Sequence, residues 1–404
     1  MHSPEAKAPA AAIWALGLTQ IVGYGTLYYS FAILAPAMAA EFALPSQWVY
    51  GALSAALFLG SLLAPTAGRL ADRHGAGRVM TFGSFAAALS LAACAAAPAR
   101  YSFVAALIAM EIASGFVLYA AAFVAIVQMG SVGAQRSITH LTLIAGFAST
   151  LFWPLTTVLH QHLSWREVYV AFAALHVLLC VPIHAWIARL ANRRRLASAG
   201  SGTGPEHPDS APSQPARARA LLLMMMAGFA LEGFVMSAIL LHMVPLLTTL
   251  GLGTAGVAAA TLFGPAQVAS RLVNMVFGGR LRQTVLAIVS AALLAAGLGL
   301  LLATTPMTAG TTLFVVLFGL GSGLASIIGG TLPLEVFGRR TYGLHVGWMS
   351  AARQFSSAFA PFVFALMMAA ISVPGAVAVL MLAAALGACA FAAVAVLAGR
   401  MPGL

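Results

Sequence analysis

The sequence predicts an all-α polytopic membrane protein with twelve transmembrane helices arranged as two six-helix bundles. Composition is the first reason: of 404 residues, 61% are hydrophobic and only 7% are charged, whereas about a quarter of the residues in an ordinary soluble domain are charged. The other two reasons are the regular spacing of apolar stretches and one long polar interruption near the middle of the chain. A span needs about 20 apolar residues, so the chain has room for about twelve spans.

Charged residues and breaks rich in proline and glycine delimit twelve apolar stretches. The first six lie at 12–38, 47–68, 79–98, 101–127, 137–160 and 166–189. The second six lie at 220–248, 255–278, 284–304, 311–334, 344–370 and 374–399. Helices in lipid are apolar nearly all round, so periodicity adds little and the ends are placed only to within a few residues.

The polar interruption at 190–219 predicts the boundary between the two bundles. It is rich in glycine, serine and proline, which is typical of a linker. It separates an N-terminal bundle, 1–189, from a C-terminal bundle, 220–404. Residues 23–36 of the first span weakly resemble residues 233–245 of the seventh, as expected of a duplicated transporter.

The distribution of arginine and lysine predicts the orientation of the spans, because these residues concentrate in cytoplasmic loops. With the N-terminus inside, only Arg100 and Arg166 fall outside. The inside set comprises Lys7, Arg69, Arg73, Arg78, Arg136, Arg189, Arg193, Arg194, Arg195, Arg217, Arg219, Arg280, Arg282, Arg339, Arg340 and Arg400. This asymmetry predicts a multi-pass protein of a bacterial inner membrane with both termini cytoplasmic. The net charge of +11 is scattered over short loops, which argues against nucleic-acid binding.

A glycine-rich and basic run, Gly-Arg-Leu-Ala-Asp-Arg-His-Gly-Ala-Gly-Arg, occupies residues 68–78 after the second span. Its glycines allow a turn and close helix approach, and its aspartate can accept hydrogen bonds from arginines or from a helix N-terminus. The run resembles the loop signature of the major facilitator superfamily. The resemblance implies two bundles that rock about a mid-membrane site, with a cytoplasmic latch formed by Gly68, Asp72, Arg73, Gly75 and Arg78.

Other stretches resemble the same superfamily, with informative departures. Residues 164–166, Ser-Trp-Arg, are similar to the start of the sixth helix in many members, and other stretches resemble a poorly characterised bacterial branch. The counterpart loop at 278–282 has no acid, so a second latch is expected to be weak or absent. Glu111 stands where many members have an arginine, and the fifth span lacks the glycine-proline motif of drug/proton antiporters. Both departures count against multidrug efflux.

Charged residues inside the spans are candidate functional residues, because each is costly in lipid unless it is paired, hydrated or facing a cavity. Glu111 and Glu232 lie near mid-depth in the fourth and seventh spans, which by resemblance line the central cavity. A carboxyl group in that setting can exchange a proton near neutral pH. Arg271 and Arg353, in the eighth and eleventh spans, are candidates for gripping a substrate carboxylate. Structural pairing between these acids and arginines is the alternative.

Polar residues at helical spacing complete the candidate site. Gln20, Tyr24 and Tyr28 recur every four residues in the first span, so they share one face of an α-helix. Such a face suits a small amphipathic or aromatic substrate, and helix packing is the alternative. His242 is a candidate titrating group near the outer mouth. Gln267 and Asn274 bracket Arg271 and make the eighth span the most polar of its half.

Motifs of other protein classes are absent or out of place. Residues 251–256 match the letters of a dinucleotide fingerprint, but no strand precedes them, so they are expected to form a turn between helices. Cys94, Cys180 and Cys389 have neither disulfide nor metal spacing, and neither a nucleotide-phosphate loop nor a hydrolase motif is present. The sequence therefore predicts no enzyme, no cofactor and no metal.

The function that these observations favour is secondary active transport. The protein is expected to move a small solute, an organic anion being one candidate, by alternating access coupled to protons. Its expected partners are the substrate, protons and the lipid bilayer, but not nucleic acid, and it is expected to be a monomer. Two alternatives stay open: export or facilitated passage of hydrophobic compounds without tight proton coupling, and a membrane sensor that no longer transports.

Overall fold

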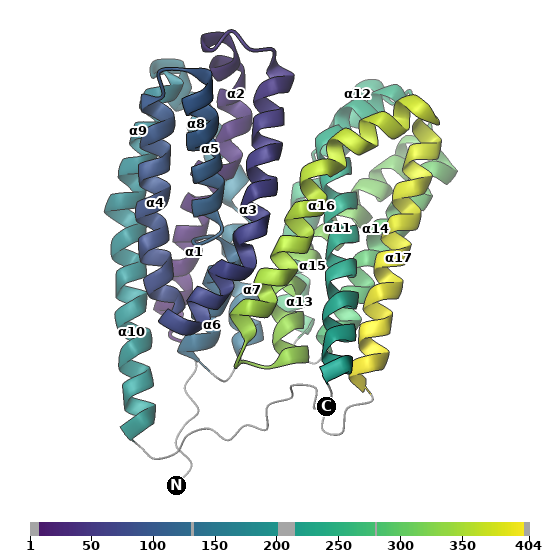
Figure 1. The fold of residues 1–404 in the computed structure, drawn as a ribbon. Coiled ribbons are helices and arrows are strands. Elements are labelled where there is room, and N and C mark those ends of the chain that lie inside the picture. The colour runs from purple at the N-terminus through teal and green to yellow at the C-terminus, as the bar shows by residue number, and fades with distance from the viewer. Residues whose placement is uncertain (1–7, 131–132, 201–214, 279–280, 400–404) are drawn as a thin grey trace. The chain divides into compact units, whose positions relative to one another are not determined.

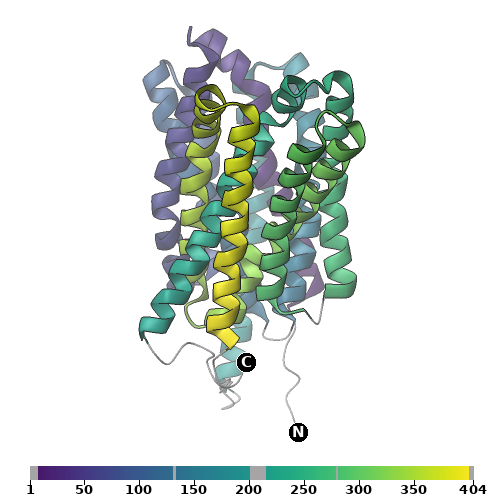
Figure 2. The same ribbon diagram turned by 90° about the vertical axis from the view of Figure 1, so that its right-hand side faces the viewer.

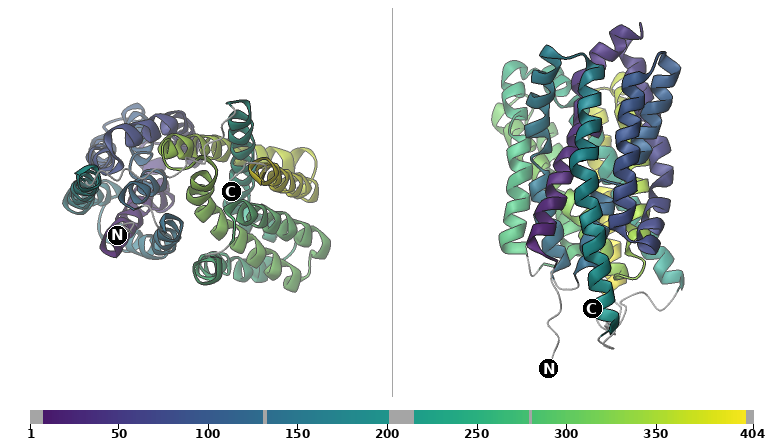
Figure 3. Two further views of the ribbon diagram at one scale, coloured as in Figure 1. Left: turned by 90° about the horizontal axis from the view of Figure 1, so that it is seen from below. Right: turned by 90° about the vertical axis from the view of Figure 1, so that its left-hand side faces the viewer.

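Every regular element in the described part of the chain is a helix (Figure 1). The computed structural model describes residues 8–130, 133–200, 215–278 and 281–399. The chain forms two compact units: Met1–Asp209 with Arg339–Gly347, and Ser210–Gly338 with Trp348–Leu404. Within each unit the helices run side by side along a common direction (Figures 2 and 3).

The predicted all-α architecture is confirmed, and the described helices group in chain order into the twelve expected spans. Ten stretches of the described residues are long and apolar enough to cross a membrane, namely Ala10–Glu41, Trp48–His74, Ala76–Ala96, Arg100–Met129, Ala134–His162, Trp165–Arg194, Pro215–Met243, Gln283–Thr304, Thr308–Phe337 and Val373–Gly399. The eighth span is the pair α12 (Gly253–Ala260) and α13 (Phe263–Phe277), and the eleventh is α16 (Tyr342–Ala370). The eighth and eleventh spans contain predicted polar residues, among them Arg271 and Arg353, and these lower the mean hydropathy of both spans.

The first unit contains several interrupted spans. Its elements are α1 (Ala10–Tyr24), the π-helix η1 (Gly25–Tyr29), α2 (Ser30–Glu41), α3 (Ser46–His74), α4 (Ala76–Ala96), α5 (Arg100–Ser114), α6 (Tyr119–Met129), α7 (Ala134–Ala145), α8 (Ala148–His162), α9 (Trp165–Leu175), the π-helix η2 (His176–Cys180) and α10 (Val181–Gly200). Spans one and six therefore each change to π-helical geometry part-way, and span four unwinds between α5 and α6. Irregularities of this kind mark functional sites in many helices.

The second unit is more regular. Besides α12, α13 and the part of α16 that follows Gly347, it contains α11 (Pro215–Thr249), α14 (Gln283–Thr304), α15 (Thr308–Phe337) and α17 (Val373–Gly399). Helix α14 packs against both α15 and α17. Close approach of α15 is possible because it presents glycines: a Cβ on Gly321 would lie 2.8 Å from the Ser290 carbonyl oxygen of α14. Small residues at helix interfaces bring the backbones of membrane helices together.

The start of the sixth span is held by a set of polar contacts that the sequence encodes locally. Ser164 caps α9, and its backbone N–H donates in turn to the Glu167 carboxylate in a capping box, which satisfies N–H groups at the helix start. Arg166 forms an ion pair of 2.7 Å with Glu41 at the end of α2, and the Trp165 indole N–H also donates to Glu41. These contacts fix the end of the first span against the start of the sixth.

Both ends of the predicted linker at 190–219 are helical. Helix α10 continues to Gly200 and α11 begins at Pro215. The central part of the linker, 201–214, lies outside the described residues. One segment of the C-terminal half, Arg339–Gly347, packs with the first unit, so the two units do not follow the halves of the sequence completely.

Candidate functional site

Glu232 on α11 lies in a polar junction inside the second unit. It is 1% exposed, and the Ser290 hydroxyl of α14 lies 2.6 Å from its Oε1. The same hydroxyl lies 2.9 Å from the Gly321 carbonyl oxygen, so two acceptors compete for one proton. The positive charge of Arg353 on α16 attracts the carboxylate through space. Its Oε2 is buried without a hydrogen-bond partner among the described residues.

Glu111 on α5 lies inside the first unit and is 5% exposed. The Ser114 hydroxyl approaches its Oε2 at 3.4 Å while donating to the Glu111 carbonyl oxygen at 2.7 Å. Cys94 on α4 and Tyr169 on α9 are close enough to interact with it electrostatically. Among the described residues neither Glu111 nor Glu232 forms a direct ion pair. The structure therefore places the two acids in separate bundles, each among neighbours of its own unit.

The polar residues of the eighth span face the tenth. The Gln267 amide donates to the Ser322 hydroxyl at 2.9 Å, and Arg271 donates to the Ser326 hydroxyl at 2.9 Å. Ser322 and Ser326 lie one turn apart on α15, so the two hydrogen bonds link α13 to successive turns of α15. Arg271 is 3% exposed. The third residue of the predicted set, Asn274, packs instead against Gly278 at the end of its own helix.

Aromatic residues of the first span meet those of the fourth. The Tyr24 ring lies 4.7 Å from the Tyr119 ring and 6.4 Å from the Tyr29 ring, measured between centroids. Residues five apart are linked in a π-helix, so η1 brings Tyr29 over Tyr24. The straight α-helical face expected for Gln20, Tyr24 and Tyr28 is therefore not formed. Gln20 is buried and donates to the Val117 carbonyl oxygen at 2.8 Å, whereas Tyr28 is 48% exposed.

His242 makes local contacts in the second unit. Its Nδ1 lies 3.0 Å from the Ala238 carbonyl oxygen one turn earlier on α11. Its ring lies 5.3 Å from the Phe364 ring of α16 in an edge-on arrangement. The ring is thus fixed against α16, and a titrating role for it stays a prediction.

Asp72 at the end of α3 accepts hydrogen bonds from the first turn of α16. The Gly343 N–H donates to Oδ1 and the Leu344 N–H to Oδ2, both at 2.9 Å. A carboxylate at a helix N-terminus satisfies free N–H groups and opposes the positive end of the helix dipole. Gly68 is required here, because a Cβ at that position would overlap the Gly343 carbonyl oxygen. Gly75 ends α3 with φ of +90°, a conformation that favours glycine.

The other predicted latch residues and two further residues complete this region. Arg73 and Arg78 are exposed. The Arg339 guanidinium donates to the carbonyl oxygens of Val127 and Gly130 at the end of α6, the second at 2.9 Å. Gln128 on α6 donates to the Ala71 carbonyl oxygen at 2.9 Å and accepts from the Ala76 N–H at 2.8 Å. The residues of the predicted latch and their partners therefore join the ends of α3 and α6 to the start of α16.

The family model of the Major Facilitator Superfamily matches residues 16–361. The chain belongs to this superfamily. No curated protein matches it in sequence. The human organic anion transporter MFSD10 (TETRAN) superposes with a TM-score of 0.70 at 15% identity, covering 94% of this chain and 98% of that one.

Two further solved structures share the major facilitator fold. The proton:xylose symporter XylE, bound to 6-bromo-6-deoxy-D-glucose, gives a TM-score of 0.68 at 12% identity over 96% of this chain and 95% of that one. The transporter FucP in its outward conformation gives 0.64 at 15% identity over 97% and 99%. At these identities the likeness establishes the fold alone.

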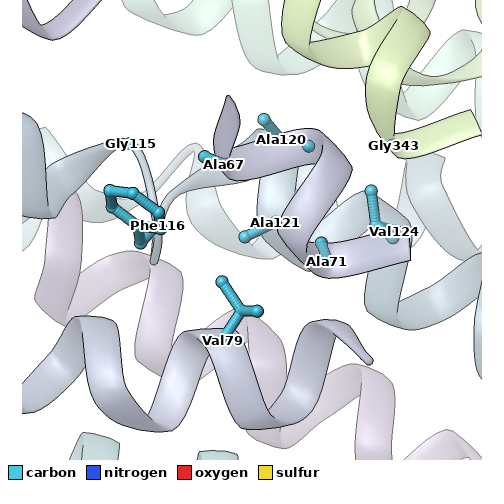
Figure 4. A pocket seen from close by; sticks show the side chains of 10 residues that line it. Ala67, Ala71, Val79, Gly115, Phe116, Ala120, Ala121, Val124 and Gly343 are labelled. Carbon is cyan, nitrogen blue, oxygen red and sulfur yellow. The ribbon is translucent and has the colours of Figure 1, made fainter. Parts of the chain in front are cut away.

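A small pocket of this major facilitator lies beneath the latch (Figure 4). Glycine, alanine, valine and phenylalanine form it, namely Ala67, Gly68, Ala71, Val79, Gly115, Phe116, Ala120, Ala121, Val124 and Gly343. None of these side chains carries a charge or a hydrogen-bonding group. The small residues of the pocket allow α3 and α6 to pack closely, and their side chains offer no hydrogen bond to a polar solute.

Several polar residues that this major facilitator buries in its first unit were not among the predicted site residues. His176 on η2 lies 2.8 Å from the Thr26 hydroxyl of η1, so the two π-helical segments meet at this bond. His184 on α10 lies 2.8 Å from the Ser84 hydroxyl and 3.0 Å from the Thr19 hydroxyl. A lone histidine in an apolar span does not reveal its partner on another span. The hydroxyl residues Thr19, Thr26 and Ser84 on other spans were the available signal, because a buried imidazole needs a hydrogen-bond partner.

Proposed function

We propose that this major facilitator is a secondary active transporter that moves a small organic anion by alternating access, coupled to protons through Glu232. The observation that carries the proposal is the environment of that carboxyl group. It is 1% exposed inside an apolar span, yet it has a hydroxyl donor and a nearby positive charge. An ionisable group at such a position is costly and is a functional candidate by default.

The surroundings of Glu232 can accommodate both its ionised and its protonated form. The ionised carboxylate accepts from Ser290 and is attracted by Arg353. The protonated form keeps the Ser290 bond at Oε1, while Oε2, which lacks a partner among the described residues, can carry the proton. A carboxyl group whose two charge states are both accommodated can gain and lose a proton during a transport cycle.

The proposal of an organic anion rests on Arg353. Protonation of Glu232 removes the negative charge that competes for the guanidinium, which can then bind a substrate carboxylate with two hydrogen bonds. Binding of the proton would in this way favour binding of the anion. Glu111, which has no such cationic neighbour identified among the described residues, is the rival coupling acid.

The first experiment identifies a ligand and then tests the coupling acid. A thermal-shift screen of the purified protein against small carboxylates, amino acids and cationic drugs should find stabilising carboxylates, because a bound ligand stabilises the folded state. In proteoliposomes, Glu232→Gln should abolish proton-driven accumulation of that ligand while counterflow exchange persists. Glu167→Gln is the control, since Glu167 caps α9 at an exposed position and its loss should leave accumulation unchanged.

The outcomes separate the competing assignments. If Glu232→Gln accumulates like the parent protein and Glu111→Gln does not, the coupling role moves to the fourth span. If both variants accumulate normally, coupling through these acids is refuted and facilitated passage is the better description. Stabilisation by cationic drugs alone would refute the organic anion.

A further inference from the structure

Helices α4 and α10 of the first unit lie side by side and run in opposite directions (Figures 1 and 3). The Ser84 hydroxyl of α4 lies 2.8 Å from the His184 ring of α10. Nearer the start of α4, a Cβ on Gly77 would lie 2.6 Å from the Ala188 Cα, so the two backbones approach closely there. This contact lies in the first turn of α4 and near the end of the sixth span, Trp165–Arg194.

An exposed arginine follows each residue of that backbone contact. Arg78 comes after Gly77 on α4 and Arg189 after Ala188 on α10, and both side chains are exposed. Because the two helices are antiparallel neighbours, the two arginines lie at nearly the same depth in the bilayer. A further exposed arginine, Arg193, lies one turn beyond Arg189 on the same face of α10. We call Arg78, Arg189 and Arg193 the basic site.

Apolar side chains continue the exposed face of α4 toward the middle of the membrane. Phe82, Phe85 and Leu89 follow Arg78 at spacings of three or four residues, so they share its face of the helix. They are 74%, 50% and 72% exposed, as apolar side chains are that contact the acyl chains of lipids. This face is thus apolar along its length and basic at one end, which matches the form of a phospholipid.

A tryptophan indicates that the basic site lies at the level of the lipid headgroups. Trp186 lies one turn before Arg189 on α10 and is 40% exposed. Tryptophan side chains concentrate at the membrane interface, where the ring contacts apolar chains and the N–H meets polar groups. Arg189 and Arg193 follow in the direction of the aqueous phase, so their guanidinium groups reach the layer that contains the lipid phosphates.

No acid of the described part of the chain pairs with the two arginines at the helix contact. Neither Arg78 nor Arg189 forms an ion pair among the described residues. Arg78 also lies in the first turn of α4, where the helix dipole repels a positive charge. Basic residues that only set the orientation of a span need to lie on one side of the membrane, but not at one depth on two touching helices. The arrangement therefore points to an anion from outside the chain.

We propose that the basic site binds the phosphate headgroup of an anionic phospholipid, whose acyl chains lie along the exposed faces of α4 and α10. A guanidinium group can bind a phosphate with two hydrogen bonds, and basic residues between membrane helices bind the headgroups of anionic lipids. The lipid would link the third and sixth spans of the first unit. The site is separate from the Glu232 junction, so the proposal does not rest on the proposed transport function.

The first test measures lipid binding to the purified protein in detergent. Native mass spectrometry gives the affinities of phosphatidylglycerol, which is anionic, and of phosphatidylcholine with the same acyl chains, which has no net charge. We expect phosphatidylglycerol to bind more tightly. Arg78→Gln and Arg189→Gln should each weaken its binding by about fivefold, which is the contribution of one basic residue near a membrane surface. Equal affinities of the two lipids for the parent protein would overturn the proposal.

Arg100→Gln is the matched control. Arg100 is also an exposed arginine of the first unit, but it begins α5 and therefore lies beyond the opposite end of α4. Its replacement should leave both affinities unchanged, and a loss equal to that of Arg189→Gln would refute a specific site in favour of diffuse surface charge. Arg78→Lys combined with Arg189→Lys keeps both charges and should retain the preference for phosphatidylglycerol. Loss of the preference in this variant, with unchanged thermal unfolding, would also refute the proposal.

Two further measurements test the position and the source of the anion. Phosphatidylglycerol with brominated acyl chains should quench a component of the tryptophan emission that Trp186→Phe removes. If that component is not quenched, the lipid binds elsewhere and the assignment to α4 and α10 is wrong. Glycerol phosphate carries the same phosphate without acyl chains and should not displace the lipid at an equal concentration. Displacement would show that the site binds a soluble anion and would refute the lipid.

Discussion

His176 and His184 lie on the same span of the first unit and are both 1% exposed, but their ring nitrogens are bonded differently. Thr19 donates to the Leu16 carbonyl oxygen, so it accepts from His184 Nε2–H, and Ser84 donates to Nδ1. The neutral His184 ring is thereby fully bonded. His176 bonds Thr26 through Nε2, while its Nδ1 is buried without a partner among the described residues.

We expect His184→Leu to destabilise the protein more than His176→Leu. The first change removes hydrogen bonds to two spans and the second removes one, and a buried polar group left unbonded costs about 1–3 kcal/mol. The difference in unfolding free energy should therefore be about 1 kcal/mol or more. Thermal unfolding of both variants in the same detergent measures it. Equal losses, or a larger loss for His176→Leu, would contradict this account of the ring bonding.

The sequence shows which charged residues are functional candidates more readily than it shows which residues share one face of a helix. The sequence alone identifies Glu111, Glu232 and Arg271, which are buried, and Arg353, which is partly buried, because a charge in an apolar span is conspicuous. It does not reveal that Ser290 is the partner of Glu232, since a serine in an apolar helix most often bonds its own backbone. The predicted α-helical face through Tyr24 and Tyr28 is not formed, because local π-helical geometry shifts the register of Tyr28. Residue spacing alone assumes a uniform helix.

At the scale of elements, the end of α3 and the start of α16 form a single capping arrangement. The run at 68–78 was recognisable because its glycines and acid are consecutive in sequence. Its partner was not recognisable, since Gly343 and Leu344 lie 271 and 272 residues away from Asp72 and contribute only backbone N–H groups. Any residue other than proline provides such a group, so no side chain indicates the contact.

We expect Asp72→Asn to slow transport without weakening substrate binding. Asparagine keeps one acceptor oxygen of the two that bind α16 and loses the charge at the helix N-terminus, which contributes about 0.3–1 kcal/mol. Initial transport rates and ligand-induced thermal shifts measure the two effects. Glu167→Gln, which alters an acid at the start of α9, is the matched control and should affect neither. Normal cycling with much weaker binding would show that Asp72 belongs to the solute site.

Glycine at position 68 gives a second test of the same arrangement. We expect Gly68→Ala to lower the unfolding temperature and to reduce the transport rate, because the added methyl group overlaps the Gly343 carbonyl oxygen and separates α3 from α16. Gly51→Ala on the same helix meets no atom within 4 Å and serves as the control. Unchanged stability in Gly68→Ala would mean that the two helices do not approach as described.

At the scale of the whole molecule, the basic residues of the loops predict which side of the membrane each end occupies. We expect both termini and the 190–219 linker to be cytoplasmic. A reporter that fluoresces only in the cytoplasm, fused after Leu404 or inserted into 201–214, should be active. A reporter that functions only outside the cytoplasm should be inactive at both places. The reverse pattern would invert the topology and exchange the inner and outer ends of every span.

The boundary between the compact units falls inside a continuous helix, between Gly347 and Trp348 of α16. Asp72 accepts hydrogen bonds from the first turn of α16, and a Cβ on Gly347 would lie 2.6 Å from the Ala64 carbonyl oxygen of α3, so this end packs closely on α3. The rest of the helix belongs to the other unit. Helix α16 therefore carries backbone of both units, and the hydrogen bonds from Gly343 and Leu344 to Asp72 hold its first turn to α3.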